Sequence, residues 1–307
     1  MKKLTVALTL ALMVSSAIAQ DIFVKKSLFS QFEPAIEKNQ IINDGHTIGD
    51  YPLLPIGEKT RVVFIKVNYS TGVSIPLGRV VMFSEKNKKL LHAIETTANL
   101  EQGPSNDWVD TPCKREDYLW KSSVGGVFKD INCVSINHFV NYFVNPTGEF
   151  QQIAALAKFE DLQIPPTIIR VTFTRYSGGG KRLVYIVDIN PEQYGVQRDA
   201  TTPWGSNGWH KDFVTRDSKK IWFLENLKIW ALDVQSRMDR AFEKDKSAFL
   251  DIRPLSSYFV EPMRGHNEAK PTVSIEDEVI ALKRLLDRGL ISEGQFNEQV
   301  KNLIQKN

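Results

Sequence analysis

Apolar and polar residues alternate with a period of two over several stretches of the chain, as in half-buried β-strands. Residues 60–69 and 77–84 form one pair of such stretches, and residues 167–176 and 181–189 form another around the sequence "SGGG". Each pair predicts a β-hairpin. A further strand is predicted over 131–144, with one face made of Val134, Ile136, His138, Val140 and Tyr142.

Two segments carry a helical period instead. Residues 218–245 have apolar side chains at steps of three and four residues, namely Leu224, Leu227, Ala231, Val234, Met238 and Ala241. A stripe of this kind beside a sheet is typical of a helix that packs on the core, although a dimer seam gives the same pattern. A shorter helix is predicted over 147–162, with Thr147 as its N-cap. Residues 87–103 fit both a strand and a helix, so they are assigned to neither.

The order of these elements, in which hairpins dominate, predicts an α+β fold rather than a parallel βαβ fold. We expect a mainly antiparallel sheet with one long packed helix, built from a main domain over residues 20–252. Residues 253–273 contain three prolines among polar residues and are predicted to form a linker. Residues 274–307 are predicted to form a C-terminal two-helix hairpin.

Local signals define this hairpin. Gly289 stands where a helix ends in a left-handed residue. Ser292 fits an N-cap, and Gln295 three residues later completes a capping box. A two-helix segment of this length buries too little apolar surface to fold alone, so its apolar faces must also cover another surface. The residues predicted to make that contact are Leu282, Leu286, Phe296, Val300 and Leu303.

The C-terminal segment resembles the SHOCT family, a short domain found at the ends of otherwise unrelated bacterial proteins. The residues that carry the resemblance are the leucines of "IALKRLL", the run "DRGLISEGQF" and Leu303, all within 275–305. Gly294 departs from the acidic residue expected there and weakens the second helix by up to about 1 kcal/mol. The resemblance implies a module for interaction or oligomerisation, without known catalytic residues. It implies nothing about residues 20–252.

The first residues have the pattern of a signal peptide. Lys2 and Lys3 precede an apolar run over 4–14, and "AIA" precedes Gln20, so cleavage is expected after Ala19. The run is too short to span a bilayer, although an uncleaved anchor is the alternative. We therefore expect a periplasmic or secreted protein without a transmembrane segment in its mature chain. Attachment to the cell envelope is a further possibility.

The charge of the chain limits the kinds of partner it can bind, and its two cysteines indicate the redox state of its compartment. The chain has 39 basic and 36 acidic residues without a basic block, which gives no electrostatic basis for binding nucleic acid. Cys113 and Cys133 should form a disulfide in an oxidising compartment. Two buried free thiols are the alternative. The absence of a C-x-x-C motif makes a redox-active pair the less favoured interpretation.

Candidate chemistry is sparse. The motifs G-x-S-x-G, S-x-x-K and H-E-x-x-H do not occur, and no cofactor or metal site is predicted. Among five scattered histidines, His138 shares a face with apolar residues, and Trp209 and His210 lie in an aromatic stretch near Asp212. A histidine on an apolar face is more often a hydrogen-bonded core residue than a ligand. These three residues are therefore weak candidates for a ligand site.

Two functions follow from these patterns. The leading prediction is an exported, non-enzymatic protein whose SHOCT-like hairpin mediates oligomerisation or binding of a protein partner. The alternative is a periplasmic hydrolase or ligand-binding enzyme that uses the aromatic loop Trp204–Phe213 and a scattered histidine. A pocket holding His138 or His210 within reach of a carboxylate would favour the alternative.

Overall fold

The structure is a computed structural model, and the chain divides into two compact units, Met1–Val260 and Glu261–Asn307. The residues that the structure describes are 20–25, 32–42, 45–57, 59–69, 75–101, 111–124, 130–141, 143, 146, 150–177, 180–199, 202–259, 283, 293, 294, 296, 297, 300 and 301.

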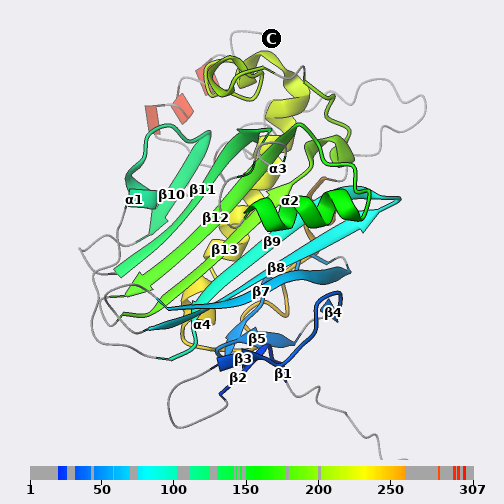
Figure 1. The fold of residues 1–307 in the computed structure, drawn as a ribbon. Coiled ribbons are helices and arrows are strands. Elements are labelled where there is room, and N and C mark those ends of the chain that lie inside the picture. Colours follow the sequence, from blue (N-terminus) through cyan, green and yellow to red (C-terminus); the bar gives the residue numbers. More distant parts are fainter. Residues whose placement is uncertain are drawn as a thin grey trace, which may run out of the picture. The chain divides into compact units, whose positions relative to one another are not determined.

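One antiparallel sheet of eight strands dominates the first unit, in the order β10-β11-β12-β13-β9-β8-β7-β4 (Figure 1). The strands span β10 Trp120–Val124, β11 Asp130–Val140, β12 Thr167–Ser177, β13 Arg182–Ile189, β9 Lys89–Asn99, β8 Pro76–Lys86, β7 Thr60–Tyr69 and β4 Ile41–Ile42. Both predicted hairpins are confirmed, because β7 pairs with β8 and β12 with β13. The segment left unassigned is strand β9, and its pairing with β13 joins the two halves of the sheet.

Five short strands within residues 20–52 form two small sheets. In the first sheet β1 (Gln20–Asp21) pairs with β5 (His46–Ile48), and β5 pairs with β6 (Tyr51–Pro52). The second sheet consists of β2 (Phe23–Lys25) and β3 (Phe32–Pro34). Both add apolar side chains to the larger of the two hydrophobic cores, including Ile22, Phe23, Ile48 and Tyr51.

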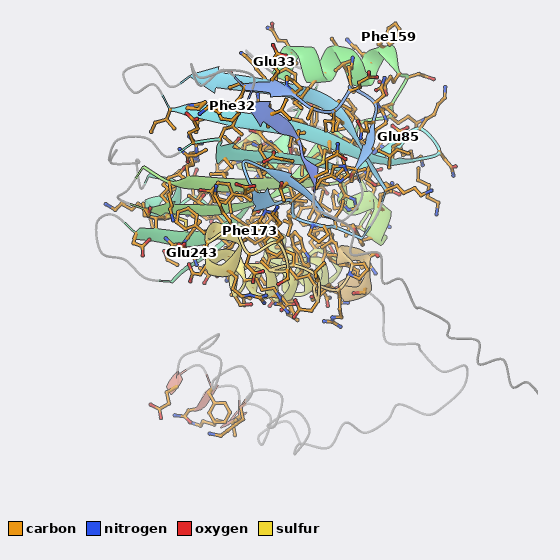
Figure 2. All side chains as sticks on the ribbon, turned by 90° about the horizontal axis from the view of Figure 1, so that it is seen from below. Phe32, Glu33, Glu85, Phe159, Phe173 and Glu243 are labelled. Atoms are coloured by element: carbon orange, nitrogen blue, oxygen red, sulfur yellow. A yellow bond between two sulfur atoms is a disulfide. The ribbon has the colours of Figure 1, made fainter. Side chains whose placement is uncertain are left out.

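Helices cover both faces of the large sheet, which confirms the α+β class. Helix α3 (Ser218–Gln235) and α4 (Met238–Phe242) lie on one face, and α2 (Phe150–Phe159) lies on the other (Figure 1). Phe173 on β12 and Phe159 on α2 mark the two sides in Figure 2. A fourth helix, α1 (Thr111–Lys114), is a single turn.

The long predicted helix is interrupted after Gln235. Ser236 Oγ donates to the backbone oxygen of Asp233 at 2.7 Å, and Arg237 Nη1 donates to the same oxygen at 2.8 Å. Side chains that bond to a helix carbonyl compete with its backbone hydrogen bonds and favour an end or a bend. The apolar stripe nevertheless continues across the break.

That stripe faces the core. All six of its residues are buried, and Trp230 on the same face meets Phe173 edge to face with 5.5 Å between ring centroids. Full burial of each large apolar side chain contributes about 1.5–3 kcal/mol. The stripe is covered within the main unit, so it is not a dimer seam. A second, smaller core lies between the sheet and α2, around Val63, Phe83, Ile153 and Ala157.

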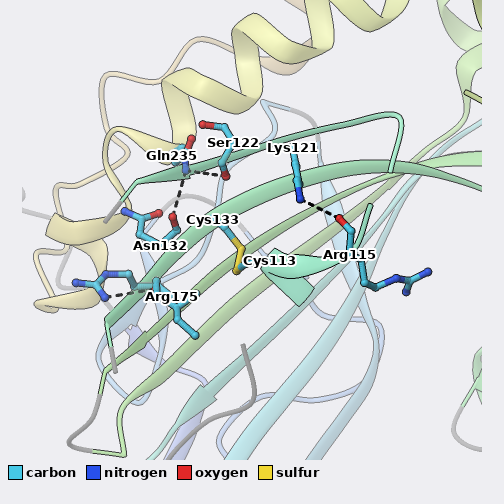
Figure 3. The surroundings of a disulfide bond; sticks show 9 residues. Cys113, Arg115, Lys121, Ser122, Asn132, Cys133, Arg175 and Gln235 are labelled. Carbon is cyan, nitrogen blue, oxygen red and sulfur yellow. Dashed lines mark hydrogen bonds between the residues drawn. A yellow bond between two sulfur atoms is a disulfide. The ribbon is translucent and has the colours of Figure 1, made fainter. Parts of the chain in front are cut away.

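The predicted disulfide is present and attaches α1 to β11. Cys113 bonds to Cys133, with a Cα–Cα distance of 5.9 Å (Figure 3). Nearby, Gln235 Nε2 donates to the backbone oxygens of Ser122 at 3.3 Å and Asn132 at 3.5 Å. The end of α3 is therefore fastened to β10 and β11 beside the disulfide.

The main unit extends beyond the predicted domain end at Ile252. Residues Leu255–Phe259 form a 3-10 helix, η4, whose Leu255, Tyr258 and Phe259 are buried. Phe259 stacks on Phe223 of α3 with 4.9 Å between centroids. The prediction of a linker from residue 253 is therefore wrong for its first residues. The prolines suggested a linker, but Leu255, Tyr258 and Phe259 pack into the core of the main unit. Within the described residues, none of the helices combines the length and apolar character that crossing a membrane requires.

Replacing both disulfide cysteines, as Cys113→Ser with Cys133→Ser, should lower the free energy of unfolding by about 3 kcal/mol, because a closed loop restricts the unfolded chain. The 20-residue separation of the pair sets this loop. Urea denaturation of the wild type and the variant measures the difference. A reductant should destabilise the wild type alone. Equal midpoints for both proteins without reductant would contradict this role.

Candidate functional site

Two of the three residues predicted as weak ligand candidates, His138 and His210, come together in one cluster. The histidine–aromatic cluster comprises His138 of β11 and three residues of the loop between β13 and α3, namely Trp204, His210 and Phe213. The third candidate, Trp209, packs on Phe223 of α3, with 5.6 Å between ring centroids. The loop is shaped locally by an Asx turn, in which Asn207 Oδ1 accepts from the backbone N–H of Trp209 at 2.9 Å.

His138 and Trp204 form the centre of the cluster. Their rings stack with 5.0 Å between centroids and 9° between planes. Trp204 Nε1 donates to the backbone oxygen of His138 at 3.1 Å, and His138 Nε2 lies 3.2 Å from the backbone oxygen of Trp204. His210 meets the Trp204 ring edge to face at 4.7 Å. These reciprocal contacts fix the loop on the end of β11.

The contacts also define the protonation of His138. A carbonyl oxygen only accepts, so Nε2 carries the proton and Nδ1 is the bare nitrogen. Nδ1 is buried without a hydrogen-bond partner in the part of the chain that the structure describes. Burial lowers the pKa of His138, and the positive charge of Lys220 and protonation of His210 would lower it further, against the opposing effects of the Trp204 carbonyl and Asp199. The side chain is therefore neutral near pH 7.

A buried ion pair lies beside the cluster. Lys220 of α3 is only 4% exposed, and its Nζ is 2.7 Å from Asp199 Oδ1 and 2.8 Å from Oδ2. The same ammonium lies 5.3 Å from the centroid of the Trp209 ring. Gly208 passes directly over this pair, because a Cβ there would stand 2.5 Å from Lys220 Nζ and 2.9 Å from Asp199 Oδ2. A side chain at this position would therefore displace the ammonium or the carboxylate of the pair.

A carboxylate is within reach of one histidine. His210 Nδ1 lies 3.3 Å from Asp212 Oδ2 and 3.4 Å from the backbone nitrogen of Asp212. A ring nitrogen either accepts or donates, so Nδ1 makes only one of these two contacts at a time. The side chain of Asp212 is exposed, so this pair lies at the outer edge of the cluster.

The cluster is closed rather than open to a substrate. His138, Trp209 and His210 are all buried, and the Trp204 ring covers the histidine at the centre. Across the described residues, no group of three or more histidine, cysteine, aspartate or glutamate side chains is arranged to hold a metal ion. The cluster therefore attaches the loop to the sheet. Sequence patterns indicated His138 and His210, but neither the stack on Trp204 nor the buried Lys220–Asp199 pair.

The residues predicted for the C-terminal hairpin belong to the second unit. Phe296 and Val300 are helical and half-buried, as the predicted second helix requires. The other predicted contact residues and the hairpin-defining residues lie outside the described part of the chain; they are Leu282, Leu286, Leu303, Gly289, Ser292 and Gln295.

Comparison with protein-family models, with curated proteins and with solved structures finds no match for this chain.

Two glycines of the same loop provide a matched test of the ion pair. Gly208→Ala should lower the free energy of unfolding by about 1–3 kcal/mol, because the methyl group displaces a buried charge from its partner. Gly205→Ala has open space around its new Cβ and should change stability by less than about 0.5 kcal/mol. Denaturant unfolding compares the two variants, and equal effects would refute the close packing over Lys220.

The lowered pKa of His138 predicts an acid sensitivity. Below pH 6.5, the usual pKa of histidine, His138 is protonated in the unfolded chain but still neutral in the folded chain. Stability is therefore complete above pH 6.5 and falls as the pH decreases towards the lower folded-state pKa. The free energy of unfolding should fall more steeply from pH 7 to pH 5 in the wild type than in His138→Phe, which keeps a ring on Trp204. Parallel pH profiles would show that His138 does not titrate in this way.

Proposed function

We propose that this is an exported, non-enzymatic protein in which the first unit is a rigid scaffold and the C-terminal hairpin mediates self-association or binding of a protein partner. The observation that carries the proposal is the division of the chain at Val260 into two compact units. The first unit closes its own hydrophobic core with η4 just before this boundary. The second unit contains the SHOCT-like segment.

The described residues of the second unit support an amphipathic second helix. Glu293, Gly294, Phe296, Asn297, Val300 and Lys301 are all helical. Phe296 and Val300, four residues apart and hence on one face, are half-buried, whereas the other four are exposed. A short amphipathic hairpin gains most of its stability by covering its apolar face with another surface.

Export is supported by the disulfide, because such bonds persist in oxidising compartments such as the periplasm and the extracellular space. The expectation of a cleaved signal peptide rests on residues 1–19, which lie outside the described part of the chain. The proposed localisation is therefore the periplasm or the exterior of the cell.

One observation favours the enzymatic alternative, namely that His138 and His210 converge with 6.0 Å between ring centroids. A general base must reach the proton that it abstracts. The bare nitrogen of His138 is buried, and the Trp204 ring lies over the imidazole. A substrate would have to displace Trp204 and break two hydrogen bonds, so the geometry supports the structural role better.

The hairpin proposal can be tested with two matched double variants of the full chain. Phe296→Ser with Val300→Ser removes the half-buried stripe, and Asn297→Ser with Lys301→Ser changes the exposed side of the same helix. Light scattering should give a reduced mass for the first variant and the wild-type mass for the second. A partner captured by the wild type should also be lost only with the first. If the masses and the captured proteins are identical for all three, the proposal fails.

A further inference from the structure

A cavity of about 470 Å³ lies in the main unit, and none of its lining residues belongs to the histidine–aromatic cluster. Its lining comes from three parts of the chain. The first comprises residues 42, 45–47, 52–57, 59 and 60, the second is Met82 of β8, and the third comprises residues 246, 249, 250, 252 and 254. The volume falls in the range of small-molecule sites, which is about 300–1,000 Å³. The wall is mixed, with His46, Thr47 and Thr60 among its polar residues. Its larger apolar side chains include Ile42, Leu54, Ile56, Met82, Phe249 and Ile252.

The two long wall segments are fixed against each other. Gly57 has a φ of +80°, and a Cβ at this position would lie 2.3 Å from Pro254 Cβ. The backbone N–H of Leu255 donates to the oxygen of Ile56 at 3.1 Å. The cavity is thus bordered by segments in direct backbone contact, which makes it a preformed feature of the fold.

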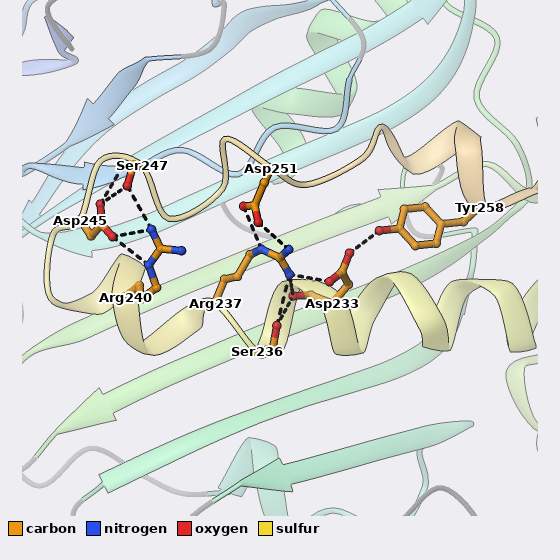
Figure 4. A network of polar contacts seen from close by, with 8 residues as sticks. All are labelled: Asp233, Ser236, Arg237, Arg240, Asp245, Ser247, Asp251 and Tyr258. Carbon is orange, nitrogen blue, oxygen red and sulfur yellow. Dashed lines mark hydrogen bonds and ion pairs between the residues drawn. The ribbon is translucent and has the colours of Figure 1, made fainter. Parts of the chain in front are cut away.

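A polar network holds the segment 245–251 on α3 and α4 (Figure 4). Arg237 Nη2 bonds to Asp251 at 3.0 Å, and Arg240 Nε bonds to Asp245 at 2.8 Å. Bonds from Ser247 and then Arg240 lower the pKa of Asp245 to about 2, and the bond from Arg237 lowers the pKa of Asp251. Both carboxylates of the segment are therefore ionised and already paired with arginines.

The cationic residues of the cavity are not paired in this way. Lys59 and Lys246 both line the cavity, are exposed, and form no ion pair with the described residues. The described lining contains no carboxylate. Asp44 and Glu58, sequence neighbours of the lining residues Gly45 and Lys59, lie outside the described residues. Two ammonium groups beside an apolar wall complement a ligand with one anionic head and an apolar chain.

Leu250 supports the same assignment. It lines the cavity, yet it is 73% exposed. A large apolar side chain left in water beside an apolar cavity gains free energy when a ligand covers it. Its position extends the apolar surface from the interior towards the solvent.

We propose that this cavity binds a fatty acid of medium chain length, with the alkyl chain on the apolar wall and the carboxylate beside Lys59 and Lys246. A neutral alkane would leave the ammonium groups unused, and a charged peptide would bring further groups that the apolar wall cannot pair. The inference is independent of the proposed association through the C-terminal hairpin.

Isothermal titration calorimetry with octanoate, decanoate and dodecanoate, each below its micelle concentration, tests the proposal on the mature chain. Affinity should rise about fourfold for each added methylene group, the factor expected for burial of one methylene. Dodecanol, which has the same chain without the charge, should bind more weakly than dodecanoate. No heat of binding for any of the acids, or equal affinity for dodecanoate and dodecanol, would overturn the proposal.

Variants distinguish the contribution of the two ammonium groups to binding from the contribution of the ligand's alkyl chain. Lys59→Gln with Lys246→Gln should weaken dodecanoate binding by about three- to tenfold, as expected for solvent-exposed charge pairs, and leave dodecanol unaffected. Lys158→Gln, at an exposed lysine of α2 on the other side of the sheet, is the matched control and should bind as the wild type does. Leu250→Asp places a carboxylate at an exposed lining position and should weaken dodecanoate binding more than dodecanol binding. Equal losses in the double lysine variant and the control would also overturn the proposal.

Discussion

Burial of the aromatic and aliphatic stripe of α3 against one face of the eight-stranded sheet is the interaction on which the rest of the main unit depends. Phe223, Leu227, Trp230, Ala231 and Val234 are inaccessible to solvent. An antiparallel sheet with an apolar face must cover that face, and here a single long helix supplies much of the cover. The position of this helix then determines where the segments before and after it can lie.

Polar interactions refine the arrangement that this packing produces. At the start of α3, Lys220 reaches Asp199 beneath Gly208 and so seats the loop that carries Trp204. At its end, Gln235 and Arg237 attach the helix to the sheet and to the segment that encloses the cavity. A buried ion pair such as Lys220–Asp199 adds little net stability compared with apolar residues, but breaking it is costly. We infer that these polar interactions select one arrangement of the loops rather than drive folding.

The sequence predicted the elements whose pattern is local. Alternation identified the hairpins, the cysteine pair indicated the disulfide, and the helical stripe identified the core face of α3. Strand β9 could not be predicted, because side chains on both of its faces are largely buried. Its residues therefore do not alternate between apolar and polar. The break after Gln235 comes from side chains that bond to the backbone oxygen of Asp233, and the apolar stripe, which continues across the break, does not show it. The anchor at Leu255 arises from contacts between distant residues, which no local pattern records. The sequence did not predict the cavity for the same reason, since its walls combine residues from near the beginning and near the end of the main unit's sequence.

We propose that the main unit is complete without the C-terminal segment, which serves association instead. Calorimetric unfolding at low protein concentration can compare the chain over 20–307 with the chain that ends at Val260. Both chains should unfold at the same transition temperature at this concentration. If the association is with itself, only the longer chain should become more stable as its concentration rises. A transition temperature about 4 °C or more lower in the shorter chain, equivalent to about 1 kcal/mol, would mean instead that the hairpin is part of the fold of the main unit.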